Sequence, residues 1–382
     1  MKIQNTKKSG LELMRIISMF FIVVFHIILH SNFIIICEGK TKFLLVLIEA
    51  FMYVHVNSFI LLTGYFQSDK DAKLSKVISI INSTWFYKLL CFAGIIFLTR
   101  YLSLPNNVPL TFHQKLISIL PLDRNENWYI NCFLLIYIFS PFLNIIINKL
   151  DQKKLKKLII LMFVIFSILG NILFGPLIPI YGEASRIFNF IIIYFIGAYL
   201  RKYPIEESRL FSTYTPKMRK YIFLGIYIVL SIISMSFRIT SIYMEGICSE
   251  LSYVFYMASI SFISPIIIIQ SVAYFLFFKN MTFNSKVINY ISGTTFGIYL
   301  FHENIYVREN LYNWLGLTKY SNSGWRLILI ILVLGVIIFI SCMIVEIIRK
   351  LIYKFFYKRK FALKLRNKLK AFIDSLGLDI NY

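Results

Sequence analysis

Two side chains with chemical potential stand in the first long apolar stretch of this sequence, GLELMRIISMFFIVVFHIILH, which runs from Gly10 to His30. Arg15 and His26 are eleven positions apart, which on an α-helix makes three full turns plus about 20°. They therefore share one stripe of the helix, separated by about 16 Å along its axis. His30 continues nearly the same face. A neutral imidazole suits general-base catalysis near neutral pH, and a guanidinium suits binding of phosphate oxygens.

A row of polar side chains along one face of an apolar helix is energetically costly in lipid unless that face lines a cavity enclosed by protein. The alternative for Arg15 is an anchor that extends to the membrane interface, and for His26 a packing residue between helices. Because the two groups occur together on one stripe, we expect them to face a common water-accessible passage between the two membrane faces.

The composition places these residues in a membrane protein, since 58% of the chain is hydrophobic, only 15% is charged and the mean hydropathy is +0.71. We expect an all-α polytopic membrane protein with about ten transmembrane helices. The first helix is too long for a signal-peptide core and lacks an A-x-A cleavage site, so we expect it to be retained. The predicted spans are 11–31, 43–66, 77–99, 127–147, 158–174, 186–200, 221–237, 251–278, 287–302 and 327–348.

The net charge of +23 follows the predicted topology rather than one nucleic-acid-binding surface. Both termini are therefore predicted to be cytosolic and the protein to lie in the plasma (inner) membrane, with no nucleic-acid partner. We predict a transmembrane domain over 1–348 and a basic tail over 349–382 that contacts anionic lipid headgroups. Most of the 41 Lys and Arg residues fall in alternate segments, namely the N-terminus, 67–76, 148–157, 201–220, 279–286 and the region from 349.

Four segments carry a resemblance to the integral-membrane acyltransferase-3 family. Arg15 and His26 match its first helix, where a basic residue, ten others and a histidine follow one another. VNSFILLTGYF (Val56 to Phe66) looks like its second helix, and NWYINCFLLIYIFSPFLN (Asn127 to Asn144) is similar to its Trp-led helix. TFGIYLFHENIYVR (Thr295 to Arg308) resembles its late segment, in the form of members that acylate surface polysaccharides.

The resemblance covers about 10–348 and implies an O-acyltransferase. The donor it implies is acetyl-CoA or another acyl-CoA, and the acceptor is a hydroxyl of a cell-envelope polysaccharide or its lipid-linked precursor. His26 is then the expected base, acting on the hydroxyl directly or through a transient acyl-imidazole. Arg15 is expected to bind the phosphates or carbonyls of acyl-CoA. No metal is expected, because the five cysteines show no metal-like spacing with histidine. The sequence implies no particular oligomeric state.

One departure from the family concerns its arginine pair ahead of the third helix, where this chain has Lys73 and Lys76. Lysine keeps the charge but loses the planar fork that fits phosphate. Lys73, Lys76 and Lys88 are predicted to add positive potential at the cytosolic mouth where the donor binds. The alternative for the loop pair is that it simply marks the cytosolic side.

Two further catalytic candidates, His302 and Glu303, stand at the outer end of the ninth span. Adjacent helical residues point about 100° apart, so a direct pair is expected only if the helix ends there, and an interface role is the alternative. Glu49 and His55 lie about 120° apart by the same geometry and are not expected to share a stripe. The predicted acceptor-binding residues are His30, Asn57, Trp128, Tyr299 and Arg308, with the aromatic belt as the alternative for Trp128.

A second class of function remains open at this point. A transporter of an acyl donor, a lipid-linked sugar or a small solute also has many spans and polar residues at mid-membrane. The sequence shows no inverted repeat and no Gly- or Pro-broken helices in matching halves, which favours the enzyme.

Overall fold

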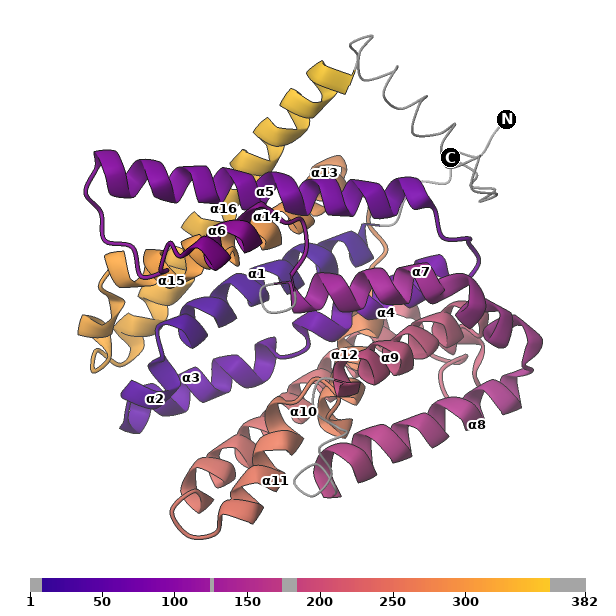
Figure 1. Ribbon diagram of the computed structural model, residues 1–382. Helices are drawn as coiled ribbons and strands as arrows, with labels where there is room; N and C mark the ends of the chain where they lie inside the picture. The colour runs from indigo at the N-terminus through magenta and orange to yellow at the C-terminus, as the bar shows by residue number, and fades with distance from the viewer. Residues whose placement is uncertain (1–8, 124–126, 174–183, 358–382) are drawn as a thin grey trace.

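The computed structural model describes residues 9–123, 127–173 and 184–357, and the regular elements in these ranges are helices (Figure 1). The basic tail predicted to contact lipid headgroups falls largely outside them. The helices are α1 (Gly10–His30), α2 (Phe33–Ile36), α3 (Gly39–Met52), α4 (His55–Gln67), α5 (Leu74–Tyr101), α6 (Phe112–Ile119), α7 (Trp128–Lys149), α8 (Gln152–Met162), η1 (Phe163–Leu173, a π-helix), α9 (Ala184–Lys202), η3 (Ile205–Glu207), α10 (Pro216–Met244), α11 (Ser249–Ile260), α12 (Pro265–Lys279), α13 (Lys286–Ser292), α14 (Thr295–His302), α15 (Ile305–Trp314), η4 (Leu317–Tyr320) and α16 (Trp325–Tyr357).

Seven helical stretches within the described ranges are long and apolar enough to cross a membrane, which confirms a multi-pass all-α protein. They are 10–30, 39–67, 74–101, 128–149, 216–244, 249–279 and 325–355. The other three predicted spans are helical but do not qualify. The run 158–174 is divided between α8 and η1, the run 186–200 forms α9, and the run 287–302 is divided between α13 and α14.

Three of the predicted spans are interrupted rather than continuous. The first break separates α3 from α4, where His55 Nδ1 donates to the carbonyl of Met52 at 2.7 Å and so satisfies a buried carbonyl at the end of α3. The second separates α11 from α12, which begins at Pro265, a residue without the N–H that a continuous helix needs. The third separates α13 from α14 at Gly293. Polar backbone thus becomes available inside the bundle.

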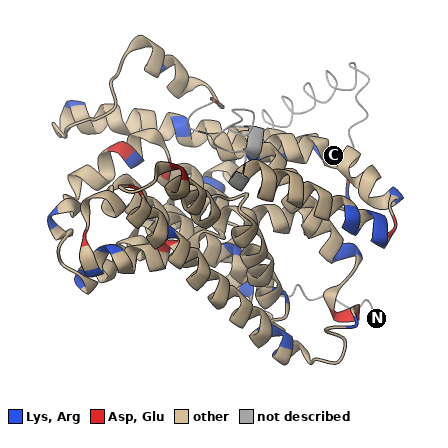
Figure 2. Ribbon diagram, turned by 90° about the horizontal axis from the view of Figure 1, so that it is seen from below, with Lys and Arg blue, Asp and Glu red and all other residues tan. Residues whose placement is uncertain are grey.

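The loops that charge patterning assigns to one side of the membrane lie together at one end of the bundle. The Ser9 N–H donates to the carbonyl of Phe283 at 2.9 Å, and Lys279 pairs with Glu206 at 3.0 Å. At the opposite end, the Asn107 N–H donates to Asn310 at 2.8 Å. In Figure 2 the Lys and Arg residues lie mostly near helix ends. The structure therefore has two distinct polar ends, and which of them is cytosolic remains a prediction.

Helices α4 and α9 cross with their backbones in contact. A Cβ atom at Gly64 would lie 2.2 Å from the carbonyl oxygen of Tyr194, and one at Gly197 would lie 2.4 Å from that of Leu61. Only glycine fits at either position, as is usual where helices approach closely in membrane proteins. This crossing fixes α4, which contributes part of the wall of the cavity described next.

Candidate active site

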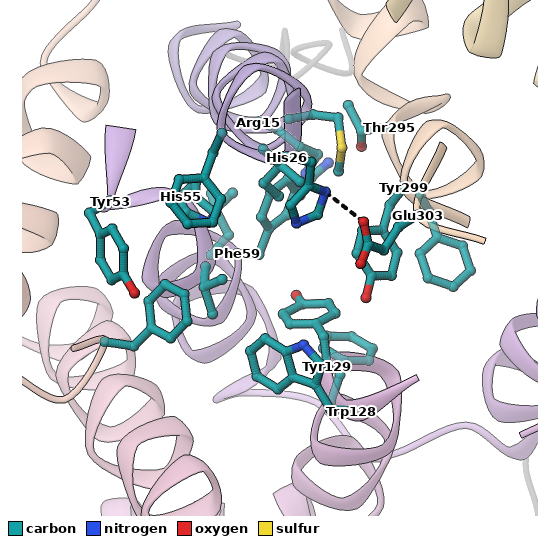
Figure 3. A pocket seen from close by; sticks show the side chains of 18 of the residues that line it. Arg15, His26, Tyr53, His55, Phe59, Trp128, Tyr129, Thr295, Tyr299 and Glu303 are labelled. Atoms are coloured by element: carbon teal, nitrogen blue, oxygen red, sulfur yellow. Dashed lines mark ion pairs between the residues drawn. The ribbon is translucent and has the colours of Figure 1, made fainter. Parts of the chain in front are cut away.

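A cavity of about 910 Å³ runs through the bundle (Figure 3). Lys70 and Lys76 line it at the end near the α4–α5 connection, and Asn32 and Ile35 line it at the opposite end. Arg15 and His26 both line it as well. The stripe of α1 deduced from their spacing therefore faces one common space, as expected.

All three helix breaks border this cavity. Tyr53 and His55 come from the first break, Phe262 from the second and Gly293 from the third. Because α3 ends before His55, the helical angle between Glu49 and His55 does not apply, and both residues line the cavity. The angle was calculated for one continuous helix, and the break is the reason that it does not decide where these two residues lie.

His26 is held by two residues from the end of α14. Its Nδ1 lies 2.9 Å from Glu303 Oε2 and 3.0 Å from His302 Nε2. The same Glu303 oxygen lies 3.2 Å from His30 Nε2, while Arg308 Nη1 donates to Glu303 Oε1 at 2.9 Å. Figure 3 shows the His26 ring projecting into the cavity with one nitrogen directed at Glu303. Glu303 is thus the centre of a network that joins α1 to α14 and α15.

This network determines which nitrogen of His26 carries a proton. His302 Nδ1 lies 2.7 Å from the carbonyl oxygen of Ile298, which can only accept, so His302 Nδ1 is protonated and its Nε2 is an acceptor when the ring is neutral. Glu303 as a carboxylate is also an acceptor. His26 Nδ1 therefore faces two acceptors and carries the proton. The Nε2 of neutral His26 is left with a free lone pair.

A histidine in this state can act as a general base. The carboxylate behind it orients the ring and stabilises the imidazolium that forms when Nε2 takes a proton. His302 and Glu303 can both contact His26 because α14 ends at His302 and Glu303 follows as its capping residue. The helix does end at this point, and His302 and Glu303 each contact His26.

At the other end of the cavity, Arg15 is paired with Glu12, one turn earlier on α1. Arg15 Nη1 donates to Glu12 Oε2 at 2.8 Å, and the Ser292 hydroxyl donates to the same oxygen at 2.5 Å. Glu12 is buried, whereas 29% of the Arg15 side chain is exposed. Glu12 was not singled out from the sequence, although an acid three residues before a functional arginine is the spacing at which helical side chains meet. Arg15 is thereby held in place with donors to spare.

The lysines expected at this mouth are divided between two places. Lys76 lines the cavity, with its Nζ 4.7 Å from the centre of the Tyr137 ring, and Lys70 lines it too. Lys73 is exposed and is not part of the cavity wall. Lys88 is buried and pairs with Asp123, which precedes α7, at 2.5 Å. Lys88 therefore does not lie at the donor mouth where it was expected, because it is at the middle of α5 and faces Asp123 rather than the cavity.

The expected acceptor-binding residues also differ in placement. Trp128 and Tyr299 line the cavity. His30 and Arg308 instead contact Glu303, and so support the base from behind. Asn57 does not reach the cavity wall: its amide donates to the carbonyl of Phe262 at 2.8 Å and thereby holds the α11–α12 break.

The same network has the geometry of a possible metal site. One ligand atom from each of His26, His302 and Glu303 lies within 4.8 Å of the others. The hydrogen bonds already described satisfy these atoms without an ion. The three residues therefore suit proton transfer as they stand.

Comparison with protein families identifies the class of reaction. A family model described as an acyltransferase domain matches residues 8–346. The chain therefore belongs to the acyltransferase-3 family, and it is a membrane acyltransferase rather than a transporter. Comparison with curated proteins and with solved structures found no match.

Proposed function

We propose that this acyltransferase moves an acyl group, normally acetyl, from cytosolic acyl-CoA to a hydroxyl of a cell-envelope glycan or its lipid-linked precursor. In this proposal the chain crosses the plasma (inner) membrane ten times with both termini in the cytosol. The observation that carries the proposal is the single cavity that is lined both by Arg15 and by the His26–Glu303 pair. One group suits binding of a phosphorylated donor, and the other suits activation of a hydroxyl.

The donor end supports an anionic ligand. Arg15, Lys70 and Lys76 line the cavity there, and Arg15 uses a single Nη1 hydrogen bond to Glu12. In the proposal its remaining N–H groups and the two lysines bind the phosphates of CoA, while the pantetheine arm extends along the cavity toward His26. The arm has to cover the rise of about 16 Å between Arg15 and His26 on α1.

The chemical step is a direct transfer. His26 Nε2 removes the proton from the acceptor hydroxyl as its oxygen attacks the thioester carbonyl, which gives a tetrahedral intermediate. The carbon–sulfur bond then breaks, and the departing CoA thiolate recovers the proton from the His26 imidazolium. The products are an ester and free CoA thiol. Glu303 stabilises the transient positive charge on His26, and Arg308 keeps Glu303 in position.

The glycan acceptor is proposed from the form of the segment Thr295 to Arg308 and from the cavity wall beside His26. Trp128, Tyr129 and Tyr299 line the cavity there, and aromatic faces with a polar edge suit a sugar ring.

An assay with purified protein tests the proposal. Acetyl-CoA and envelope glycan from a strain lacking this protein are mixed with the enzyme, and both thiol release and acetyl ester on the glycan are measured. In the wild type, thiol release should accompany formation of the ester. The His26→Ala variant should release no thiol and form no ester. Full transfer by His26→Ala would contradict the catalytic assignment. Envelope glycan whose acetyl content is unchanged by deletion of the gene would contradict the acceptor.

A further inference from the structure

A second pair of charged side chains, Glu49 on α3 and Arg238 on α10, lines the cavity away from Glu303. Glu49 Oε2 and Arg238 Nε are 3.9 Å apart, which is beyond hydrogen-bond distance. Within the described ranges both atoms are buried and have no hydrogen-bond partner. Figure 3 shows Tyr53, from the helix break that follows Glu49, on the far side of the cavity from Glu303.

Such a pair is unusual in a folded protein. Glu49 is only 6% exposed, and a buried charged group is unfavourable unless each of its polar atoms has a hydrogen bond. Buried polar atoms without partners are rare, and each calls for an explanation. Because both residues border a cavity, a bound ligand is a natural source of the missing hydrogen bonds.

Aromatic rings surround the pair. The Arg238 guanidinium lies 4.9 Å from the centre of the Tyr256 ring. The Tyr53 and Phe262 rings are stacked with centroids 4.8 Å apart, and the Trp128 ring is stacked on Phe262 at 6.0 Å. These side chains all line the cavity. The site therefore offers flat apolar faces next to one acceptor and one donor, which complements the apolar face and hydroxyl edge of a sugar ring.

We propose that Glu49 and Arg238 bind hydroxyl groups of a sugar unit in the acceptor glycan, while the aromatic side chains cover the face of its ring. This inference rests on the proposed function. The pair has no net charge, so it favours a neutral ligand, whereas a lone guanidinium would favour phosphate or carboxylate. A hydroxyl can donate to the carboxylate and accept from the guanidinium at the same time.

The position of the pair indicates which sugar it binds. Phe25 contacts His26 at 5.9 Å and Tyr53 at 5.6 Å, measured between ring centroids. The Phe25 ring therefore stands between His26 and Tyr53, and Tyr53 follows Glu49 by one helical turn, with its N–H donating to the Glu49 carbonyl. A sugar held at Glu49 lies on the far side of Phe25 from the catalytic imidazole. It is a unit next to the one that is acylated, and Glu49 and Arg238 select the acceptor without touching the reacting atoms.

Kinetics with both substrates test this assignment. Purified Glu49→Gln and Arg238→Gln enzymes are assayed with acetyl-CoA and envelope glycan fragments from a strain lacking this protein. The KM for the glycan should rise at least about tenfold, the effect of losing a hydrogen bond to a charged group. The KM for acetyl-CoA should stay unchanged. Glu245→Gln and Arg326→Gln are matched controls at exposed positions and should behave as wild type.

The outcomes separate this inference from the proposed function. A wild-type enzyme that acylates no glycan contradicts the proposed function itself. A wild-type enzyme that does so, together with a folded Glu49→Gln variant of unchanged glycan KM, overturns the inference alone. Equal rises in both KM values also overturn it, because they indicate a structural role. If Arg238→Gln does not fold, Arg238→Lys keeps the charge beside Glu49 and should still raise the glycan KM; an unchanged value contradicts the proposal.

Discussion

The two ends of the cavity hold their functional side chains in different ways. Near His26 the groups are fixed, since the Glu303 carboxylate by itself contacts three side chains, those of His26, His30 and Arg308, at distances from 2.9 to 3.2 Å. Near Arg15 the described residues combine one ion pair, Arg15 with Glu12, with lysines on flexible side chains. Proton transfer needs an aligned nitrogen, whereas a phosphate needs mainly positive charge. Variants at the two ends should therefore change different kinetic constants.

The largest effect is expected for His26→Ala, which removes the base. Loss of a general base typically lowers the rate by about 10²–10⁴-fold, so kcat for glycan acylation should fall by that range while the KM for acetyl-CoA changes little. Steady-state kinetics with purified enzyme provide the measurement. A variant that loses donor affinity instead would remove the proposed distinction between the two ends.

Glu303→Gln should have the next largest effect. The substitution keeps the shape but removes the charge that stabilises the imidazolium, and a hydrogen bond to a charged group contributes about 1.5–3 kcal/mol, roughly 10–150-fold in rate. We expect this loss in kcat. Glu309→Gln is a suitable control, since Glu309 contacts Arg308 but not His26. Equal losses of kcat in the two variants would mean that the ion pair between Glu303 and His26 does not cause the loss.

At the opposite end, Lys76→Ala should raise the KM for acetyl-CoA about threefold to tenfold with kcat unchanged, as expected when uniform binding is removed. Lys73→Ala is the matched control, because Lys73 is exposed and does not line the cavity. Raising the salt concentration should shrink the difference between Lys76→Ala and wild type. An equal rise in KM for both variants would count against a donor site in the cavity.

Lys88→Met should affect stability and not donor binding. It removes the buried cation of the pair with Asp123, and breaking a largely buried ion pair by removing one partner costs about 3–5 kcal/mol. The melting temperature in detergent should fall, and Lys88→Met/Asp123→Leu should recover part of the loss. A raised KM for acetyl-CoA with an unchanged melting temperature would contradict this prediction and would indicate that Lys88 binds the donor.

The smallest effect is expected from a chelator. His26, His302 and Glu303 are close enough together to hold a metal ion, but their hydrogen bonds are complete without one. Incubation with EDTA should leave the rate of acylation unchanged, and added Zn²⁺ should inhibit by occupying His26. Loss of activity in EDTA that Zn²⁺ restores would replace the general base with metal chemistry.

The sequence predicted the parts of this molecule that depend on one helix at a time. The spacing of Arg15 and His26 places both on one face because helical geometry alone decides it. The pairing of Lys88 with Asp123 and of His26 with Glu303 depends on how separate helices pack, and no periodicity encodes it. The breaks in the predicted spans were missed for a related reason. Residues such as Tyr53 and Val54 are apolar and continue the hydropathy pattern, so the chain reads as one span although its helix ends there.

The contact between Gly64 and Gly197 has a mechanical consequence. With backbone against backbone there is no side chain whose rotation could change the separation of α4 and α9, so these two helices move as one block. The passage can then widen only by displacement of the other helices around it. One of these helices is α10, which carries Arg238. A displacement of α10 that widens the passage for a bulky glycan would therefore also move a residue proposed to bind that glycan.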